Sequence, residues 1–228
     1  MRDLILQEQF EIEVLDRLNS GRFLRFLYFG GGTMLRLCHG LDRYSVDLDF
    51  WIADPRQAET LFGRLEQFLG GFYELRDAAA KHFSLLFELK TTAYPRSLKI
   101  EIRTEDRKPE TEQAIAYSTH ADRQVLLQAM TLQQMMLLKT AALLDRGEIR
   151  DAYDLEFLVK RGLQPAGEKI TLENILNRID AFKKTDYTSK LGSLIEPDMR
   201  PYYRDQNFRI LKAAVKDRLS EMERKQND

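Results

Sequence analysis

The chain has 228 residues, of which 43% are hydrophobic and 31% are charged, with 12 glycines and 6 prolines. This composition excludes a collagen-like or broadly disordered chain, and the length suits one or two domains of ~150 residues each. The 35 basic and 36 acidic residues leave a formal charge of −1, so composition alone does not indicate a nucleic-acid or membrane-surface protein. Cys38 is the single cysteine, which excludes an internal disulfide. We therefore expect a soluble, cytoplasmic globular protein with no membrane partner.

The first third of the chain alternates helical and strand patterns. The predicted elements are a helix, a buried strand, a glycine turn with a short helix, a second strand and another helix, at residues 3–18, 23–29, 30–40, 45–52 and 55–69. Gly40 is typical of a helix C-terminus, and Asp54 followed by Pro55 is typical of a helix start.

Residues 72–130 follow a mostly period-two pattern. The clearest predicted strands are FELKTTAY, SLKIEIRT and RQVLLQAM, at residues 87–94, 97–104 and 123–130. Turn-rich pieces such as RTEDRKPETE separate them.

The character of the sequence changes after Met130. Thr131-Leu132-Gln133-Gln134 fits a capping box that opens a helix through Leu144. Further helices are predicted at 150–160 and in the charged, amphipathic segment 205–225. We therefore expect an α+β fold in two domains, a mixed sheet with helices over residues 1–130 and an all-helical domain over residues 131–228.

Two aspartates on the second strand are the first chemical signal. Asp47 and Asp49 lie two residues apart, so both side chains project from one face of the strand. Paired carboxylates suit Mg²⁺, a hard cation that usually shares its oxygen ligands with substrate phosphates. An Asp-x-Asp motif alone is more often a solvated strand edge.

A glycine turn precedes this strand. Gly31, Gly32 and Thr33 lie between a strand and a helix, where glycines let the backbone approach a phosphate and the helix N-terminus supplies free N–H groups. Such a turn alone is more often only a tight turn. The order of the two motifs and their short separation, residues 34–46, favour a phosphate cradle beside a metal pair.

The string GGGTMLRL…DRYSVDLDF resembles the AbiEii/AbiGii-type toxin branch of the DNA polymerase β-like nucleotidyltransferase superfamily. Downstream, MMLLKTAALLDRGEIRDAYDLEFL resembles the paired C-terminal motifs of that branch. These motifs cover residues 29–51 and 135–158, and the α+β-then-helical layout agrees with the family.

The resemblance implies roles for residues of the N-terminal half. Gly31, Gly32 and Thr33 would bind the triphosphate of a nucleotide, and Asp47 and Asp49 would hold Mg²⁺, or Mn²⁺ in its place.

A third carboxylate is usual in the superfamily. The best match is Glu101, which would help to deprotonate the attacking hydroxyl and would hold a second metal ion; its alternative is an ordinary exposed strand acid. Arg43 and Ser45 match the family pattern before the metal strand and would contact the nucleotide. The alternative for Arg43 is an exposed loop arginine.

The helical half would contribute two residues, reaching a nucleotide held between the two domains. Lys139 lies among apolar neighbours and either extends to solvent or meets a phosphate; the resemblance favours the phosphate. Arg146, seven residues on, shares its helix face. Asp151 is the matching active-site acid, and Asp154 would be structural support.

The implied function is a metal-dependent nucleotidyltransferase that moves an NMP from an NTP to an acceptor hydroxyl. By resemblance it would be the toxin of a type IV toxin–antitoxin or abortive-infection pair, with a genetically linked antitoxin. Family members bind GTP, and some modify tRNA, so RNA is the expected acceptor. The balanced charge leaves a protein or small-molecule acceptor open, as well as a non-catalytic nucleotide-binding module.

Overall fold

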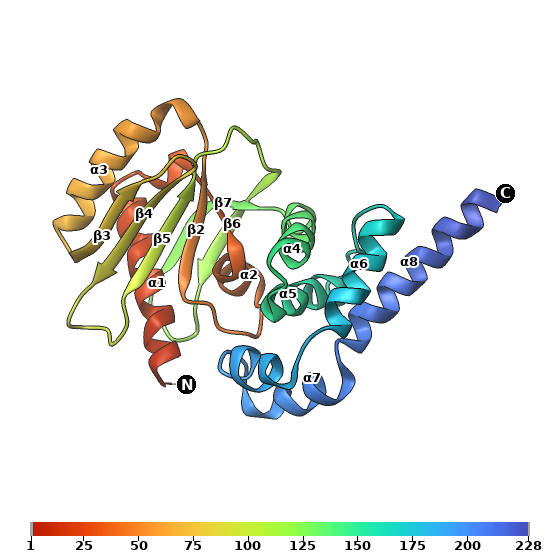
Figure 1. Ribbon diagram of the computed structural model, residues 1–228. Coiled ribbons are helices and arrows are strands. Elements are labelled where there is room, and N and C mark those ends of the chain that lie inside the picture. The colour runs from red at the N-terminus through yellow and green to blue at the C-terminus, as the bar shows by residue number, and fades with distance from the viewer. Residues whose placement is uncertain (1, 228) are drawn as a thin grey trace. The chain divides into compact units, whose positions relative to one another are not determined.

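The computed structural model describes residues 2–227 and divides after Thr131 into an N-terminal unit and a C-terminal unit that begins at Leu132 (Figure 1). The N-terminal unit has three α-helices, α1 (Arg2–Ser20), α2 (Gly31–His39) and α3 (Ala58–Gly70). Its strands are β1 (Leu27–Gly30), β2 (Asp47–Ile52), β3 (Glu74–Ala80), β4 (Ser84–Lys90), β5 (Leu98–Arg103), β6 (Thr111–Tyr117) and β7 (Gln124–Met130). Short 3-10 helices occupy Leu24–Phe26 and Pro55–Gln57.

The seven strands form one mixed sheet in the order β3-β4-β5-β2-β1-β7-β6 (Figure 1). Strand β2 pairs with β1 in antiparallel fashion and with β5 in parallel fashion, so it lies in the middle of the sheet. Strand β1 also pairs with β7 in parallel. A central strand is rigid because both of its edges are hydrogen-bonded, and β2 carries the two aspartates.

One face of the sheet forms the core of the N-terminal unit. Leu48 and Phe50 of β2 are at most 1% exposed, and their register partners Ile100 and Ile102 of β5 are equally buried. Helix α3 packs on this face, where Phe62 of α3 stacks on Phe87 of β4. Since side chains alternate along a strand, burial of Leu48 and Phe50 sends Asp47 and Asp49 to the opposite face.

The C-terminal unit is helical throughout. It contains α4 (Leu132–Arg146), α5 (Ile149–Lys160), α6 (Lys169–Asp180), a π-helical segment (Asp186–Leu191), a 3-10 turn (Pro197–Met199), α7 (Arg200–Gln206) and α8 (Arg209–Asn227). Tyr153, Tyr203 and Phe208 pack together in its core, with ring centroids 4.6 and 5.2 Å apart. The buried carboxylate of Glu156 accepts a hydrogen bond from the Leu211 amide at 3.2 Å, which satisfies a free N–H group in the first turn of α8. Within the described part of the chain, none of the helices has both the length and the apolar character of a membrane span.

The predicted fold class is confirmed: a mixed sheet with helices, followed by a helical C-terminal region. Several local predictions differ from the structure, among them the strand predicted for residues 87–94, because β4 already ends at Lys90. Residues 24–26 of the first predicted strand form a 3-10 turn, so β1 begins only at Leu27. The single helix predicted for 205–225 is wrong, because Asn207 and Phe208 take positive φ values of 46° and 53° and separate α7 from α8. Strand β3, which was not predicted separately, ends in three alanines, and alanine has little strand preference.

Candidate active site

The three predicted carboxylates lie on neighbouring strands at matching positions. In the parallel pairing of β2 with β5, Asp49 is opposite Glu101 and Asp47 is opposite Lys99. Residues opposite each other in a ladder point to the same face of the sheet. Asp47, Asp49 and Glu101 are all half-buried on the face opposite to Leu48 and Phe50. Their side chains are therefore partly shielded from water, and Trp51, two residues after Asp49 on the same face, is 7% exposed.

The glycine turn packs directly against one of these carboxylates. Gly31 opens α2 with φ of +77°, and a Cβ built on it would overlap the Asp49 carboxylate and lie 2.8 Å from its Cγ. Any side chain at this position would therefore displace Asp49, and the positive φ disfavours one independently. The backbone N–H groups of the first turn of α2, which have no partner within the helix, consequently lie close to Asp49.

The second glycine of the turn meets the loop that precedes β2. A Cβ on Gly32 would overlap the Arg43 guanidinium and lie 3.0 Å from the Ser45 hydroxyl. Gly31, Gly32, Arg43, Ser45 and Asp49 are thus brought together around one turn. An anion at this turn would meet backbone N–H groups at the positive end of the helix, beside a guanidinium.

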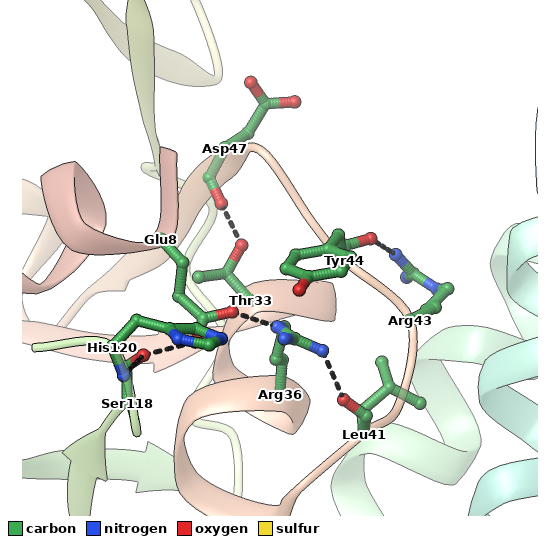
Figure 2. A network of polar contacts seen from close by, with 9 residues as sticks. All are labelled: Glu8, Thr33, Arg36, Leu41, Arg43, Tyr44, Asp47, Ser118 and His120. Atoms are coloured by element: carbon green, nitrogen blue, oxygen red, sulfur yellow. Dashed lines mark hydrogen bonds and ion pairs between the residues drawn. The ribbon is translucent and has the colours of Figure 1, made fainter. Parts of the chain in front are cut away.

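Thr33 joins the turn to β2 through the protein interior. Its side chain is fully buried, and its hydroxyl donates to the Asp47 carbonyl at 2.6 Å (Figure 2). The Thr33 hydroxyl therefore spends its one proton on a hydrogen bond that links α2 to β2. This bond fixes the backbone of Asp47 relative to the glycine turn.

Arg43 is 2% exposed, and its Nη1 donates to the Tyr44 carbonyl at 2.9 Å (Figure 2). The alternative of an exposed loop arginine is therefore wrong. A guanidinium cannot shed its charge on burial, so its position against Gly32 places a permanent positive charge at the turn.

The described residues 2–227 contain no group of three His, Cys, Asp or Glu side chains close enough to hold a metal ion. Mg²⁺ does not require such a cage, because it is usually held by one or two carboxylates, waters and the phosphates of the substrate. Asp47 and Asp49 supply two carboxylates of the hard-oxygen type, and the lack of a side chain at Gly31 lets the Asp49 carboxylate lie against the glycine turn. The residues present therefore fit a metal that arrives with a nucleotide.

The predicted residues of the helical unit form a charge network of their own. The Lys139 side chain is 8% exposed, and its Nζ lies 3.3 Å from Asp151 and 2.6 Å from Asp154, both of which are fully buried. Arg146 donates two hydrogen bonds of 2.7 Å to Asp151. The alternative in which Lys139 extends into solvent is thus wrong, and the shared face predicted for Lys139 and Arg146 is confirmed by their common partner.

Sequence reasoning missed a group of polar residues on α1. Gln7, Glu8 and Glu11 are at most 4% exposed. A signal was present, because Glu8 and Glu11 stand in the same helical stripe as Leu4, Leu15 and Leu18, which are all core residues. Burying an acid within an apolar stripe costs free energy unless the carboxyl group has polar partners, so Glu8 and Glu11 are candidates for a functional role.

Among these residues, Glu11 has a carboxyl group whose pKa is strongly shifted by its surroundings. Burial, together with the nearby carboxylates of Glu8 and Asp47, raises its pKa well above the ordinary value. Neither of its carboxylate oxygens has a hydrogen-bond partner among the described residues. The folded protein therefore holds the Glu11 proton to a higher pH than the unfolded chain does.

This difference predicts a pH-dependent stability. Because the folded state holds the Glu11 proton to higher pH than the unfolded state, stability falls as the pH rises above about 4.5, by at most ~1.4 kcal/mol per pH unit. The variant Glu11→Gln removes that slope, so its melting temperature should gain on that of the wild type as the pH is raised from 4.5 toward neutrality. Thermal melts across this range test the expectation, with the exposed Glu66→Gln as control. Parallel curves for wild type and Glu11→Gln would contradict it.

Comparisons with known proteins identify the family and the fold of the chain. The family model described as "Nucleotidyl transferase AbiEii toxin, Type IV TA system" matches residues 13–226. No curated protein sequence matches significantly.

Among solved structures, JHP933 from Helicobacter pylori is similar at 19% identity with a TM-score of 0.57, over 96% of each chain. MenT4, a nucleotidyltransferase toxin from Mycobacterium tuberculosis, is similar at 16% identity with a TM-score of 0.50, over 90% of this chain and 85% of its own. These two similarities show a common fold. The match of the family model over nearly the whole chain shows more: the protein belongs to the AbiEii family of nucleotidyltransferase toxins of type IV toxin–antitoxin systems.

Proposed function

We propose that this enzyme uses Mg²⁺ to transfer an NMP from an NTP to a hydroxyl of an RNA acceptor, with tRNA as the first candidate. The observation that carries the proposal is the pairing of Asp49 with Glu101 on one sheet face, with Asp49 packed against Gly31. A toxin that blocks an RNA in this way would act inside the cell that makes it. A genetically linked antitoxin is then its expected partner.

The N-terminal unit supplies the binding groups. The free N–H groups at the start of α2 and the Arg43 guanidinium would hold the triphosphate, and Ser45 would add a hydroxyl beside it. Asp47 and Asp49 would hold Mg²⁺, which when bound neutralises phosphate charge and polarises the reacting phosphate. The buried link from Thr33 to Asp47 keeps these groups in fixed positions, so catalysis is mostly positioning and charge stabilisation.

The reaction would be a single displacement at the α-phosphorus. The oxygen of the acceptor hydroxyl forms a bond to that phosphorus, and the bond from phosphorus to the oxygen bridging to the β-phosphate breaks. Pyrophosphate leaves with the electron pair of the broken bond. We assign Glu101, beside Asp49, to receive the proton of the hydroxyl.

Lys139 and Asp151 are proposed as supporting residues of the helical unit. The Asp151 carboxylate is shared by Lys139 and Arg146, so it would fix the direction of both cations toward a phosphate. A cation whose position is fixed in this way binds an anion with a smaller loss of conformational entropy.

The test is incubation of the protein with each α-³²P-labelled NTP, total tRNA, and Mg²⁺, Mn²⁺ or a chelator. Label in the RNA that requires the metal is the expected result, and it also identifies the base. Label on the protein itself would replace the RNA acceptor with a side chain. Absence of label in both, with the nucleotide bound, would contradict transfer to a macromolecule and direct the search to small-molecule acceptors.

A further inference from the structure

The loop of residues 41–46 connects α2 to β2 and carries both Arg43 and Ser45. It has no regular secondary structure of its own. Its position therefore depends on contacts that its backbone and side chains make with neighbouring elements. Two side chains from outside the loop hold its backbone, Arg36 of α2 and Gln7 of α1.

Arg36 holds the loop at two points. Its Nη1 donates to the Leu41 carbonyl at 3.1 Å, and its guanidinium lies 3.9 Å from the centre of the Tyr44 ring (Figure 2). Tyr44 directly follows Arg43, and the Tyr44 carbonyl accepts the hydrogen bond from Arg43. Arg36 thus contacts the first residue of the loop and the residue on which Arg43 rests.

Arg36 is itself held in place by an ion pair with Glu8 of α1. The Arg36 Nε donates to the Glu8 carboxylate, whose side chain is 5% exposed. The Ser118 hydroxyl donates to the other Glu8 oxygen, and Ser118 accepts in turn from the His120 amide at 3.0 Å (Figure 2). Since both Glu8 oxygens and two nitrogens of Arg36 are engaged in hydrogen bonds, and the Glu8 side chain is buried, Arg36 is a rigid support for the loop.

Gln7 holds the far end of the same loop. Its Nε2 donates to the Val46 carbonyl at 3.1 Å and to the Ser97 carbonyl at 3.4 Å. Val46 directly precedes Asp47 of β2, and Ser97 directly precedes β5, the strand of Glu101. One side-chain amide of α1 therefore ties together the starts of the two strands that carry the carboxylates.

We propose that Arg36, anchored by Glu8, is a positioning residue for nucleotide binding: it sets the loop so that Arg43 and Ser45 face the glycine turn. The inference rests on the proposed function, because it assumes that the triphosphate binds at this turn. Arg36 acts through the loop and is not a catalytic residue. A lysine cannot replace it, because one ammonium group cannot bond Glu8, reach the Leu41 carbonyl and lie flat on Tyr44 together.

The test compares wild type, Arg36→Lys and Glu8→Gln. Calorimetric titration with each Mg²⁺–NTP gives the dissociation constant, and the labelling assay gives KM and kcat. For the NTP that wild type uses, we expect both variants to raise the dissociation constant and KM about tenfold while kcat changes less than threefold. Arg17→Lys is the matched control, because Arg17 also stacks on an aromatic ring, 4.3 Å from the centre of Phe72, and should leave KM unchanged.

The outcomes separate the two proposals. A lowered melting temperature with unchanged KM in both variants would overturn the inference, since it would make the ion pair purely structural. Wild-type protein that binds none of the four NTPs would instead overturn the proposed function. If Arg36→Lys does not fold, Tyr44→Leu removes the stacked ring and leaves the ion pair intact. It should raise KM severalfold, and an unchanged KM would again overturn the inference.

Discussion

The variant Asp49→Asn is expected to lose nucleotidyl transfer by at least ~10³-fold, the largest effect on activity that we predict. Asparagine keeps the size of the side chain against Gly31 but removes the negative charge that would hold the metal beside the triphosphate. The loss should appear in kcat, because the glycine turn and Arg43 still bind phosphate. Single-turnover transfer of labelled NMP measures it.

Asp77→Asn is the matched control for this variant. Asp77 lies on β3 at the edge of the same sheet and is exposed, so the same chemical change there should leave transfer unaltered. The melting temperature of Asp49→Asn should stay close to that of wild type, because Asp49 is only half-buried. Transfer by Asp49→Asn at wild-type rate would contradict the assignment of Asp49 as a metal ligand.

Lys139→Met is expected to give the largest loss of stability, about 3–5 kcal/mol in the free energy of unfolding. Lys139 neutralises Asp151 and Asp154, which are both fully buried, and Arg146 contacts Asp151. Removing the ammonium group leaves Asp154 as a buried charge without its 2.6 Å partner. Urea unfolding followed by far-UV circular dichroism measures the loss.

Two comparisons make this prediction specific. Lys169→Met removes a lysine from an exposed ion pair with Glu223 and should have no measurable effect, because exposed pairs are screened by water and salt. The double variant Lys139→Met with Asp154→Asn should recover part of the lost stability, because it no longer buries a carboxylate charge that has lost its 2.6 Å contact with Lys139. A loss of less than 1 kcal/mol for Lys139→Met would show that the network tolerates the missing charge.

The features that the sequence by itself determined are local ones. The spacing of Asp47 and Asp49 sends both to one strand face in any sheet, because side chains alternate with period two. The run of glycines ahead of α2 and the left-handed Gly40 at its end follow from backbone sterics that concern a few adjacent residues. The helical character after Met130 likewise follows from caps and periodicity within single segments.

The tertiary structure alone decided everything that depends on strand pairing and on burial. The register of β2 with β5 puts Glu101 opposite Asp49, although the two are far apart in the chain and no local motif marks Glu101. Burial decided the partners of Arg43 and Lys139, which a sequence leaves free to reach solvent. The apolar stripe of α1 marks Glu8 as unusual, but the partners of Arg36, Glu8 and Gln7 became visible only in three dimensions, because they are contacts among α1, α2 and the loop before β2. Such contacts form between distant segments, and their energies depend on desolvation, which no local pattern encodes.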